Sequence, residues 1–356
     1  MDVDSSIWRG KKILVTGHTG FKGSWLVFLL KDLGAEVYGV SLPVDNTKQS
    51  LYSDAEVSTC MSKEYFYDLR QESLVEKVLS ETKPDYVFHL AAQAYVRESI
   101  RNPLESISVN VIGTANVLVK SLANRSILGI TIVTTDKVYE NLENRVPFKE
   151  GDTLGGKDPY SASKASAEHI VNSLRHSINV NRTPISTARA GNVIGGGDWG
   201  HERLIPDLVR SIINQQTLVI RNPNSVRPWQ YVLDCLYGYV LLAQTHLLQN
   251  YNYPTAVNFG PKDSYPVIEL IKIFEDEFET SIEINVINSE IYESNWLQLN
   301  SKLAKDTLGW QPSFSHQEAI SLTAKWYSRF LKGENAKSLI CEEIKNFKSV
   351  NFKLFK

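Results

Sequence analysis

The stretch KILVTGHTGFKGSW, residues 12–25, decides the fold of this chain. Its first five residues form an apolar run typical of a buried strand, and residues 21–33 continue as a predicted helix. Gly17, Gly20 and Gly23 recur every third residue where the strand passes into the helix. Glycines so placed permit a tight turn and close approach of the backbone to a pyrophosphate. A turn alone can require glycine, but this position favours a dinucleotide site at the helix N-terminus.

Strand-like and helix-like segments alternate through the first half of the chain. Further short apolar runs predict strands at residues 36–41, 65–67, 86–90, within 127–135 and at 185–190. Helical patterns lie between them at residues 73–81, 104–123 and 160–175. Apolar strands separated by helix-length segments indicate a parallel sheet covered on both faces. We therefore expect an α/β fold with a Rossmann-type, doubly wound parallel sheet.

The pattern becomes irregular after Gly191. Residues 191–207 are rich in glycine and polar side chains, as is typical of a loop over a ligand cleft. Helical patterns at residues 206–215, 266–279 and 317–332 then mix with short strands, which predicts a smaller mixed α/β lobe. We expect three parts: a Rossmann domain over 8–191, completed by part of 228–262, a substrate-binding lobe over 192–227 and 263–335, and a C-terminal tail over 336–356.

Composition excludes several classes of protein. The 356 residues are 42% hydrophobic and 22% charged, which is ordinary globular usage and argues against disorder or a coiled coil. The formal net charge of −2 gives no electrostatic reason to expect a nucleic-acid partner. The three cysteines form no CxxC pair, so neither a disulfide framework nor a metal site is expected, and a reducing cytoplasm fits.

No segment predicts a membrane partner or a signal peptide. The first twelve residues lack an apolar core, and polar residues interrupt the uncharged stretch 235–261, which predicts an amphipathic or buried helix followed by a strand. We therefore expect a soluble protein. Lysine and phenylalanine alternate in the last twelve residues, 345–356. This pattern favours a frayed, solvated terminus over a membrane-surface segment.

The second predicted strand bears on the choice of dinucleotide. It ends Val40-Ser41-Leu42, and the first carboxylate after it, Asp45, lies in a loop. The usual acidic partner of the adenosine ribose is thus absent from the strand tip, and the rule does not separate NAD from NADP. Asp68, after the third strand, suits either an adenine contact, together with Leu69, or the N-cap of the next helix.

Tyr160 and Lys164 in YSASK are the first candidate catalytic pair. They stand four residues apart at the start of a predicted helix, so both side chains lie on one face. A nearby ammonium group would lower the pKa of the phenol and make it a base for a hydroxyl proton near neutral pH. The pair occurs by chance on many helices, but its position after the glycine turn makes it specific.

The end of the fifth strand supplies a second candidate group, TTDKVYE. Thr135 falls at the carboxyl end of that strand, where open parallel sheets bind their ligands. Its hydroxyl can hydrogen-bond a substrate oxygen beside Tyr160, and Asp136 and Lys137 follow as an acid/base pair. A polar turn at a strand end is the simpler alternative, but position and chemistry together favour function.

Five motifs together resemble the extended short-chain dehydrogenase/reductase family that acts on nucleotide sugars. They are TGHTGFKG, LAAQ, TTDKVYE, PYSASK and RAGNVIGGGDW, and the resemblance spans roughly residues 8–332. Four narrower stretches resemble the branch of this family whose substrate is CDP-glucose: GHTGFKGSW, TDKVYEN, GGGDW followed by RLIPD, and IRNPNSVRPWQYV.

The resemblance implies a 4,6-dehydratase with NAD as cofactor. Such an enzyme oxidises C4 of the sugar, eliminates water across C5 and C6, and returns the hydride to C6. The product would be CDP-4-keto-6-deoxyglucose, and the enzyme would be a lyase because the net redox change is zero. The resemblance also implies a homodimer or a dimer of dimers, paired through residues 104–123 and 160–175, and a role in deoxysugar supply for surface polysaccharide such as O-antigen.

The resemblance and the motifs together give a set of candidate site residues. Catalysis is expected from Thr135, Asp136, Lys137, Tyr160 and Lys164. Cofactor binding is expected from Gly17, His18, Thr19, Gly20, Phe21, Lys22, Gly23, Asp68, Leu69, Ala91, Ala92, Gln93, Asn110, Tyr160 and Lys164. Substrate binding is expected from Gln93, Asn192, Arg203, Arg221 and Arg227.

One departure from the family pattern concerns the C5 base. Many of these dehydratases have Asp-Glu after the threonine, whereas this chain has Asp136-Lys137, as in the CDP-glucose branch. Asp136 is expected to protonate the leaving hydroxyl, which requires a raised pKa, and Lys137 is the candidate for C5. A lysine can accept a proton only when its pKa is depressed by burial or by neighbouring positive charge.

Three other functions compete with this interpretation. A dehydratase for a dTDP-, UDP- or GDP-linked sugar would share every motif, because base selection depends on the C-terminal lobe. A nucleotide-sugar 4-epimerase shares the glycine turn and the Tyr-Lys pair but needs no acid/base pair after Thr135. A cofactor-binding protein without catalysis would be expected to have lost Tyr160 or Lys164.

Overall fold

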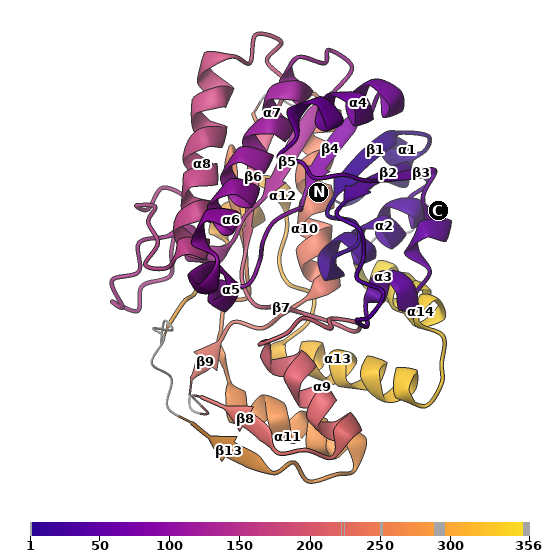
Figure 1. Ribbon diagram of the computed structural model, residues 1–356, viewed down its shortest axis with the longest axis vertical. Helices are drawn as coiled ribbons and strands as arrows, with labels where there is room; N and C mark the ends of the chain where they lie inside the picture. The colour runs from indigo at the N-terminus through magenta and orange to yellow at the C-terminus, as the bar shows by residue number, and fades with distance from the viewer. Residues whose placement is uncertain (1, 222, 224, 250–251, 288–295, 352–356) are drawn as a thin grey trace.

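A seven-stranded parallel sheet forms the centre of the protein. The computed structural model describes residues 2–221, 223, 225–249, 252–287 and 296–351 (Figure 1). The strand order is β11-β6-β5-β4-β1-β2-β3, and every neighbouring pair is parallel. The strands are β1 (Lys12–Thr16), β2 (Glu36–Ser41), β3 (Lys63–Phe66), β4 (Tyr86–His89), β5 (Gly129–Val133), β6 (Ile185–Ala190) and β11 (Ala256–Phe259). The predicted fold class is confirmed.

Helices cover both faces of the sheet, as the apolar strands require (Figure 1). One face carries α4 (Glu72–Thr82), α7 (Thr114–Leu122) and α8 (Pro159–Ser177), which pack on one another. The other carries α2 (Phe21–Asp32) and α10 (Val232–Leu247), and α14 (Ala336–Asn351) packs outside α2. Buried residues lie on every side of α10, so this helix is buried and not amphipathic. Among the described residues, no helix is both long and apolar enough to cross a membrane.

The predicted helix at 104–123 is a composite element. It consists of α6 (Pro103–Ile107), a π-helical turn η2 (Ser108–Gly113) and α7. A π-turn inside a helix displaces the side chains of that turn from the regular helical face and is frequent at functional sites. Here it carries Asn110, which is fully buried.

The strand order reverses between β1 and β4, and the glycine turn lies at this point. In an open α/β sheet the crevice at such a reversal is where ligands bind. Gly17 follows β1 with φ +75°, and a Cβ atom there would lie 2.7 Å from the backbone nitrogen of Ala91, which follows β4. Only glycine fits this contact, because the left-handed conformation and the nearby backbone both exclude a side chain.

The C-terminal lobe contains strand pairs and helices, most of which lie below the sheet in Figure 1, whereas the helix at Lys302–Leu308 packs against α10 and β11. Its strands pair two by two, β10 with β7, β12 with β9 and β13 with β8. Their bounds are β7 (Val193–Ile194), β8 (Leu218–Ile220), β9 (Val226–Arg227), β10 (Gln230–Tyr231), β12 (Tyr265–Pro266) and β13 (Ile284–Val286). The helices are α9 (Leu204–Asn214), α11 (Val267–Phe278), α12 (Lys302–Leu308) and α13 (His316–Leu331). As expected, the described residues of the lobe form no second regular sheet.

The expectation of a frayed terminus is wrong for residues 345–351. These residues complete α14, and Phe347 is 2% exposed against Phe314 and Tyr237. The phenylalanine at helical spacing from Ile340 and Ile344 gives α14 an apolar face, which the protein buries. Phe352, Lys353, Phe355 and Lys356 lie outside the described residues.

Short elements complete the chain. They are α1 (Ser5–Trp8), α3 (Leu51–Asp54), η1 (Val57–Cys60), α5 (Val96–Arg101) and η3 (Asp136–Val138). Among these, α3 follows β2 and η3 follows β5, so both lie at the carboxyl edge of the sheet.

Candidate active site

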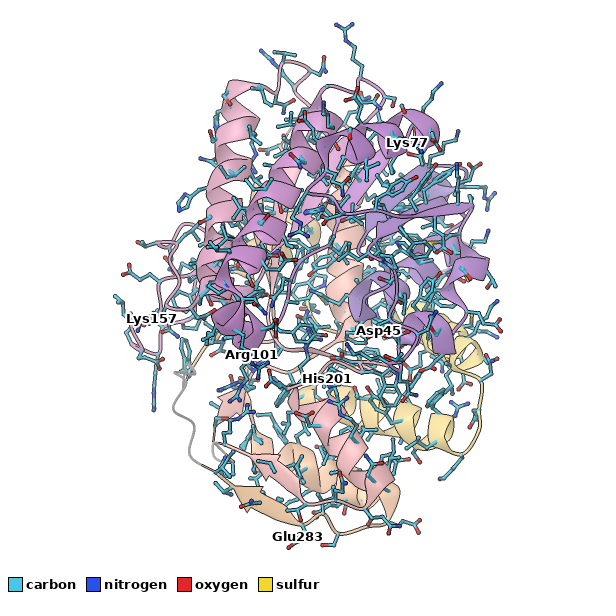
Figure 2. The ribbon with its side chains drawn as sticks, viewed as in Figure 1. Asp45, Lys77, Arg101, Lys157, His201 and Glu283 are labelled. Carbon is cyan, nitrogen blue, oxygen red and sulfur yellow. The ribbon has the colours of Figure 1, made fainter. Side chains whose placement is uncertain are left out.

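A cavity of about 850 Å³ opens at the carboxyl edge of the sheet. Its wall combines the glycine turn, the segments that follow β2 to β5, and residues of the C-terminal lobe. In Figure 2 the labelled Asp45, after β2, and His201, before α9, lie at the level where the sheet meets the lobe. The cavity therefore lies where an open parallel sheet is expected to bind a dinucleotide.

The glycine turn has the shape that a pyrophosphate requires. A Cβ atom on Gly23 would lie 2.1 Å from the carbonyl oxygen of Gly17, so strand and helix are in close contact here. Gly17, Thr19, Gly20 and Phe21 all line the cavity, and α2 starts at Phe21 with no side chain capping its N-terminus. Uncapped N–H groups and the positive end of the helix dipole fit an anionic group at this position.

The side chains of His18 and Lys22 turn away from one another. His18 is fully buried under β2, where its Nε2 lies 3.2 Å from Glu64 Oε2, and it does not line the cavity. Gly39 leaves room for the imidazole, because a Cβ atom there would lie 2.6 Å from its Nδ1. Lys22 lines the cavity and donates to the hydroxyl of Tyr239 at 3.4 Å, and burial lowers the pKa of Lys22.

The expected adenosine end of the cavity contains Asp68 and Leu69. Asp68 is not a helix N-cap, because Gln71 occupies that position of α4. Its carboxylate accepts hydrogen bonds from Arg70, at 2.9 Å from the backbone nitrogen, and these bonds lower the pKa of Asp68. The remaining alternative, contact with a ligand in the cavity, stays a prediction.

Asn110 supports the segment after β4. Its Oδ1 accepts from Gln93 N at 2.8 Å, and its Nδ2 donates to Gln93 O at 3.0 Å and to Ser163 Oγ at 2.9 Å. Ala91 and Ala92 line the cavity, whereas Gln93 does not. The π-turn thus places an amide that fixes the backbone of the cavity wall to α8.

Tyr160 and Lys164 occupy one face of α8, as predicted, but the expected effect on the phenol is wrong. Lys164 Nζ is buried and donates to the carbonyl oxygen of Val133 at 2.8 Å. Burial raises the pKa of Tyr160 to about 12, while a hydrogen bond with Thr135 and the charge of Arg203 partly oppose this increase. Burial also lowers the pKa of Lys164 to about 8, so this side chain still carries a positive charge most of the time near neutral pH.

Asp136 is a buried carboxyl group directed at the cavity. It is 3% exposed and lines the cavity, and its Oδ1 accepts the hydroxyl of Thr135 at 2.9 Å. Its Oδ2 has no hydrogen-bond partner among the described residues, and Gly191 leaves room for it, because a Cβ atom there would lie 2.2 Å away. Burial raises the pKa of Asp136, as protonation of a leaving group requires. Lys137 lines the same wall.

The expected substrate residues Asn192, Arg203, Arg221 and Arg227 also line the cavity. Arg203 is held by Asp198, with Nη1 2.9 Å from Oδ2, and by Tyr95, whose ring centre lies 4.9 Å from the guanidinium carbon. Nothing near Asp198 or Tyr95 in the sequence indicates a contact with Arg203. The motif GGGDW contains Asp198, but its partner is visible only in the fold.

A buried ion pair beneath the site was also not predicted from the sequence. Glu168, one turn after Lys164 on α8, accepts from Arg189 Nε at 2.8 Å and from the hydroxyl of Thr134 at 2.6 Å. Arg189 Nη1 donates in turn to the hydroxyl of Tyr139 at 2.8 Å. These bonds fix the strand end that precedes Thr135 to the helix that carries Tyr160. No local sequence pattern indicates them, because the partners come from separate elements.

The sheet, the glycine turn and the Tyr160–Lys164 face define a short-chain dehydrogenase/reductase of the extended type. Residues 14–323 match the family model described as GDP-mannose 4,6 dehydratase, and the chain belongs to this family. It is 37% identical over 355 residues to the CDP-glucose 4,6-dehydratase of Salmonella typhimurium, with 96% of each chain covered. A dTDP-glucose 4,6-dehydratase from Xanthomonas campestris is 28% identical, with 88% of this chain and 92% of that one covered.

Solved structures share the fold. A UDP-glucose 4-epimerase from Thermotoga maritima has a TM-score of 0.78 and 24% identity, with 90% of this chain and 99% of that one covered. A dTDP-glucose 4,6-dehydratase from Streptomyces venezuelae has a TM-score of 0.77 and 22% identity, with 89% and 97% covered. Epimerases and dehydratases therefore share this architecture, and the choice between them depends on the site.

Proposed function

We propose that this protein is a CDP-D-glucose 4,6-dehydratase that uses NAD. The observation that carries the proposal is the buried Asp136, which lines the cavity together with Lys137 and Tyr160. One of its oxygens has no hydrogen-bond partner among the described residues, and its pKa is raised. An epimerase eliminates no water and has no use for a proton donor at this position. The relative at 37% identity over nearly the whole chain supports CDP as the nucleotide.

The cofactor would occupy the part of the cavity that the sheet forms. The glycine turn and α2 would hold its pyrophosphate, Asp68 and Leu69 its adenosine, and Ala91 and Ala92 would line its path along β4. Bound NAD would supply the hydride acceptor for C4 and the hydride donor for C6. We assign 8–191 and part of 228–262 to this function, and 192–227 with 263–335 to the nucleotide sugar.

Tyr160 carries out the first proton transfer. Its phenol takes the proton of the sugar 4-hydroxyl, and the adjacent Thr135 hydroxyl orients that oxygen. Because burial raises the pKa of Tyr160, the phenolate needs the positive charge of Arg203 and a hydrogen bond from the Thr135 hydroxyl, which would turn from Asp136 to the phenolate oxygen. Lys164 is fixed to the end of β5 through Val133 and contributes a nearby positive charge.

Asp136 and Lys137 act in the elimination step. The 4-keto group acidifies the proton on C5, which passes to Lys137, while the bond between C6 and its hydroxyl breaks. Asp136 gives its proton to the departing hydroxyl, so that water leaves and a double bond joins C5 and C6. The hydride would then return to C6 from the bound cofactor, reduced in the first step, while Lys137 returns the proton to C5, so the double bond is saturated and the net redox change of the sugar is zero.

Substitution of Lys137 by alanine tests its assignment at C5. We expect incorporation of solvent deuterium at C5 of the product to slow by about 10²-fold, the usual contribution of a positioned general base. NMR of the product formed in D₂O measures the rate, and an arginine variant at the same position keeps the charge but is not expected to restore transfer. Wash-in at the wild-type rate in Lys137→Ala would exclude this role.

A substrate panel tests the function as a whole. Purified protein with NAD is incubated with CDP-, dTDP-, UDP- and GDP-glucose, and mass spectrometry detects the loss of one water. We expect loss with CDP-glucose only. Loss with another nucleotide would keep the reaction and change the substrate, whereas a C4 epimer detected by NMR would replace the reaction. Absence of turnover on all four would contradict the proposed enzyme.

We also propose a homodimer and a role in deoxysugar supply. Four apolar side chains of the α5–α6–η2 region are 42–80% exposed, which supports pairing through this face. They are Ile100, Leu104, Ile107 and Ile112. A CDP-4-keto-6-deoxy sugar is a substrate for reductases and aminotransferases, so surface polysaccharide synthesis such as that of O-antigen is the expected destination.

A further inference from the structure

Two segments from opposite halves of the cavity meet above it. The cofactor-side segment, residues 42–54, follows β2, and the substrate-side loop, residues 195–203, precedes α9. Both line the cavity, the first with Leu42 and Lys48 to Leu51, the second with most of its residues. A direct connection between them would join the two ligand sites that the proposed function requires.

The connection consists of one hydrogen bond and one packed contact. Trp199 Nε1 donates to Asp54 Oδ2 at 2.9 Å, and the same oxygen accepts from Gln49 Nε2 at 3.3 Å. Gly197, with φ +79°, lies so close to Leu51 that a Cβ atom there would be 2.3 Å from Leu51 Cδ1. Leu51 is 2% exposed and Trp199 is 8% exposed, so the packed contact is buried, while the hydrogen bond to Asp54 is partly buried.

Each side of the contact is fixed to a different ligand-binding group. On the substrate side, the hydroxyl of Tyr327 donates to the carbonyl oxygen of Asp198 at 2.7 Å, and the Asp198 carboxylate pairs with Arg203. The indole of Trp199 packs edge-on against the ring of Tyr327 at 5.3 Å. The position of Trp199 is therefore tied to that of the guanidinium that would meet the substrate diphosphate.

On the cofactor side the contacts lead back to the glycine turn. The hydroxyl of Tyr52, on α3 beside Asp54, donates to Glu64 at 2.9 Å. Glu64 is also the partner of His18, which is part of the turn. These contacts, joined through the backbone of α3 that carries both Tyr52 and Asp54, link the expected pyrophosphate site to Arg203.

We propose that the Trp199–Asp54 contact couples the two ligands, so that a nucleotide diphosphate on Arg203 slows the release of NAD. The inference rests on the proposed function, because that reaction gives a reason for the coupling. The hydride removed from C4 must return to C6 of the same sugar, so the cofactor must stay bound while the substrate is present. Trp199 and Asp54 are positioning residues in this account, because neither touches the reacting atoms.

The test measures NAD release and needs no turnover. Protein loaded with NAD is mixed with an excess of alcohol dehydrogenase and ethanol, and the appearance of NADH reports the dissociation rate, with and without CDP. Trp199→Phe removes the N–H donor and keeps an aromatic ring against Tyr327. Trp310→Phe is the matched control, since its buried Nε1 also donates one hydrogen bond, to Asp234 O at 2.9 Å, and Trp310 does not line the cavity.

We expect CDP to slow release from the wild type by about five- to 100-fold, the usual range of coupling between two ligand sites. In Trp199→Phe the effect of CDP should fall below about twofold, and release without CDP should be about five times faster, as expected for loss of one hydrogen bond. Asp54→Ala should reproduce this result if Trp199→Phe does not fold, and Asp54→Asn, which keeps an acceptor, should restore coupling.

Three results would overturn the inference. They are an absence of any CDP effect in the wild type, wild-type coupling in both Trp199→Phe and Asp54→Ala, or an equal loss in Trp310→Phe. The substrate panel separates this failure from failure of the proposed function, since the panel scores turnover and this assay scores release. A wild-type protein that binds no NAD would contradict both.

Discussion

The two halves of the cavity are built in different ways. The sheet half consists of seven parallel strands of four to six residues, each in a continuous ladder with its neighbours. The lobe half has no such sheet: it combines helices with strand pairs only two or three residues long, joined by loops. Reacting groups need positions fixed to a fraction of an ångström, which regular elements provide, whereas recognition can be carried by loops that differ among relatives. We therefore expect changes in the sheet half to alter rates, and changes in the lobe to alter affinity and choice of nucleotide.

The largest effect is expected from Tyr160→Phe, in the sheet half. The variant lacks the phenolic oxygen that takes the 4-hydroxyl proton, so kcat with CDP-glucose should fall by about 10³- to 10⁴-fold. NAD affinity and KM should change by less than about threefold, because the ring that remains fills the same space. Steady-state kinetics and NAD titration measure both. A decrease in affinity with little change in kcat would assign Tyr160 to binding.

Asp136→Asn should have the next largest effect and should separate the steps. The amide cannot give a proton to the leaving hydroxyl, so water loss should slow by about 10²- to 10³-fold, while oxidation at C4 continues. In the wild type the raised pKa of Asp136 means that the elimination rate falls as pH rises through that pKa, because only the protonated acid donates. Rapid-quench mass spectrometry across pH should show this decrease in the wild type and its absence in the variant.

Much of the sheet half could be predicted from the sequence. The bounds of β1, β2 and β6 agree with the apolar runs, because fully buried strands leave little freedom in composition. The glycine turn could be predicted equally well, because Gly17 and Gly23 lie so close to backbone atoms that no side chain fits there. The sequence could also place Thr135, Asp136 and Tyr160 near the ligand cleft, and all three line the cavity, because each follows directly from a strand end or a helix start.

The groups that the sequence did not reveal depend on partners far along the chain. Trp199 and Asp54 are 145 residues apart, and nothing near either one indicates the other. The prediction for the pKa of Tyr160 was wrong for a related reason, because helical spacing gives the direction of Lys164 but not the burial of the phenol by residues from other parts of the chain. The prediction of a frayed tail was wrong because the alternation of lysine with phenylalanine does not show that the apolar residues form one face of α14, which the protein buries.

A smaller effect is expected from Arg227→Lys, in the lobe half. Lysine keeps the positive charge that lowers the pKa of Asp136 but loses the planar fork that suits a diphosphate. KM for CDP-glucose should rise by about tenfold with kcat changed by less than about threefold, as measured by steady-state kinetics. Arg125→Lys, away from the cavity wall, serves as the control. A large decrease in kcat would contradict the comparison between the two halves, because it would mean that a residue of the lobe takes part in the chemical step.

The smallest effect concerns Glu343, where the two halves are joined. Glu343 lies on α14, which packs on α2 of the sheet half, and it accepts the hydroxyl of Tyr231 in β10. Burial raises the pKa of Glu343 to about 8, so the folded protein holds a proton that the unfolded chain has lost above about pH 4.5. The stability that this proton contributes is complete at low pH and is lost as pH rises through about 8. Between about pH 6 and pH 8, Tm should fall about 2–4 °C more in the wild type than in Glu343→Gln, whose amide does not titrate. If a thermal-shift series showed Tm falling equally with pH in the wild type and in Glu343→Gln, the Glu343 carboxylate would already be charged where it meets Tyr231. The two halves would then be joined through an ionised group.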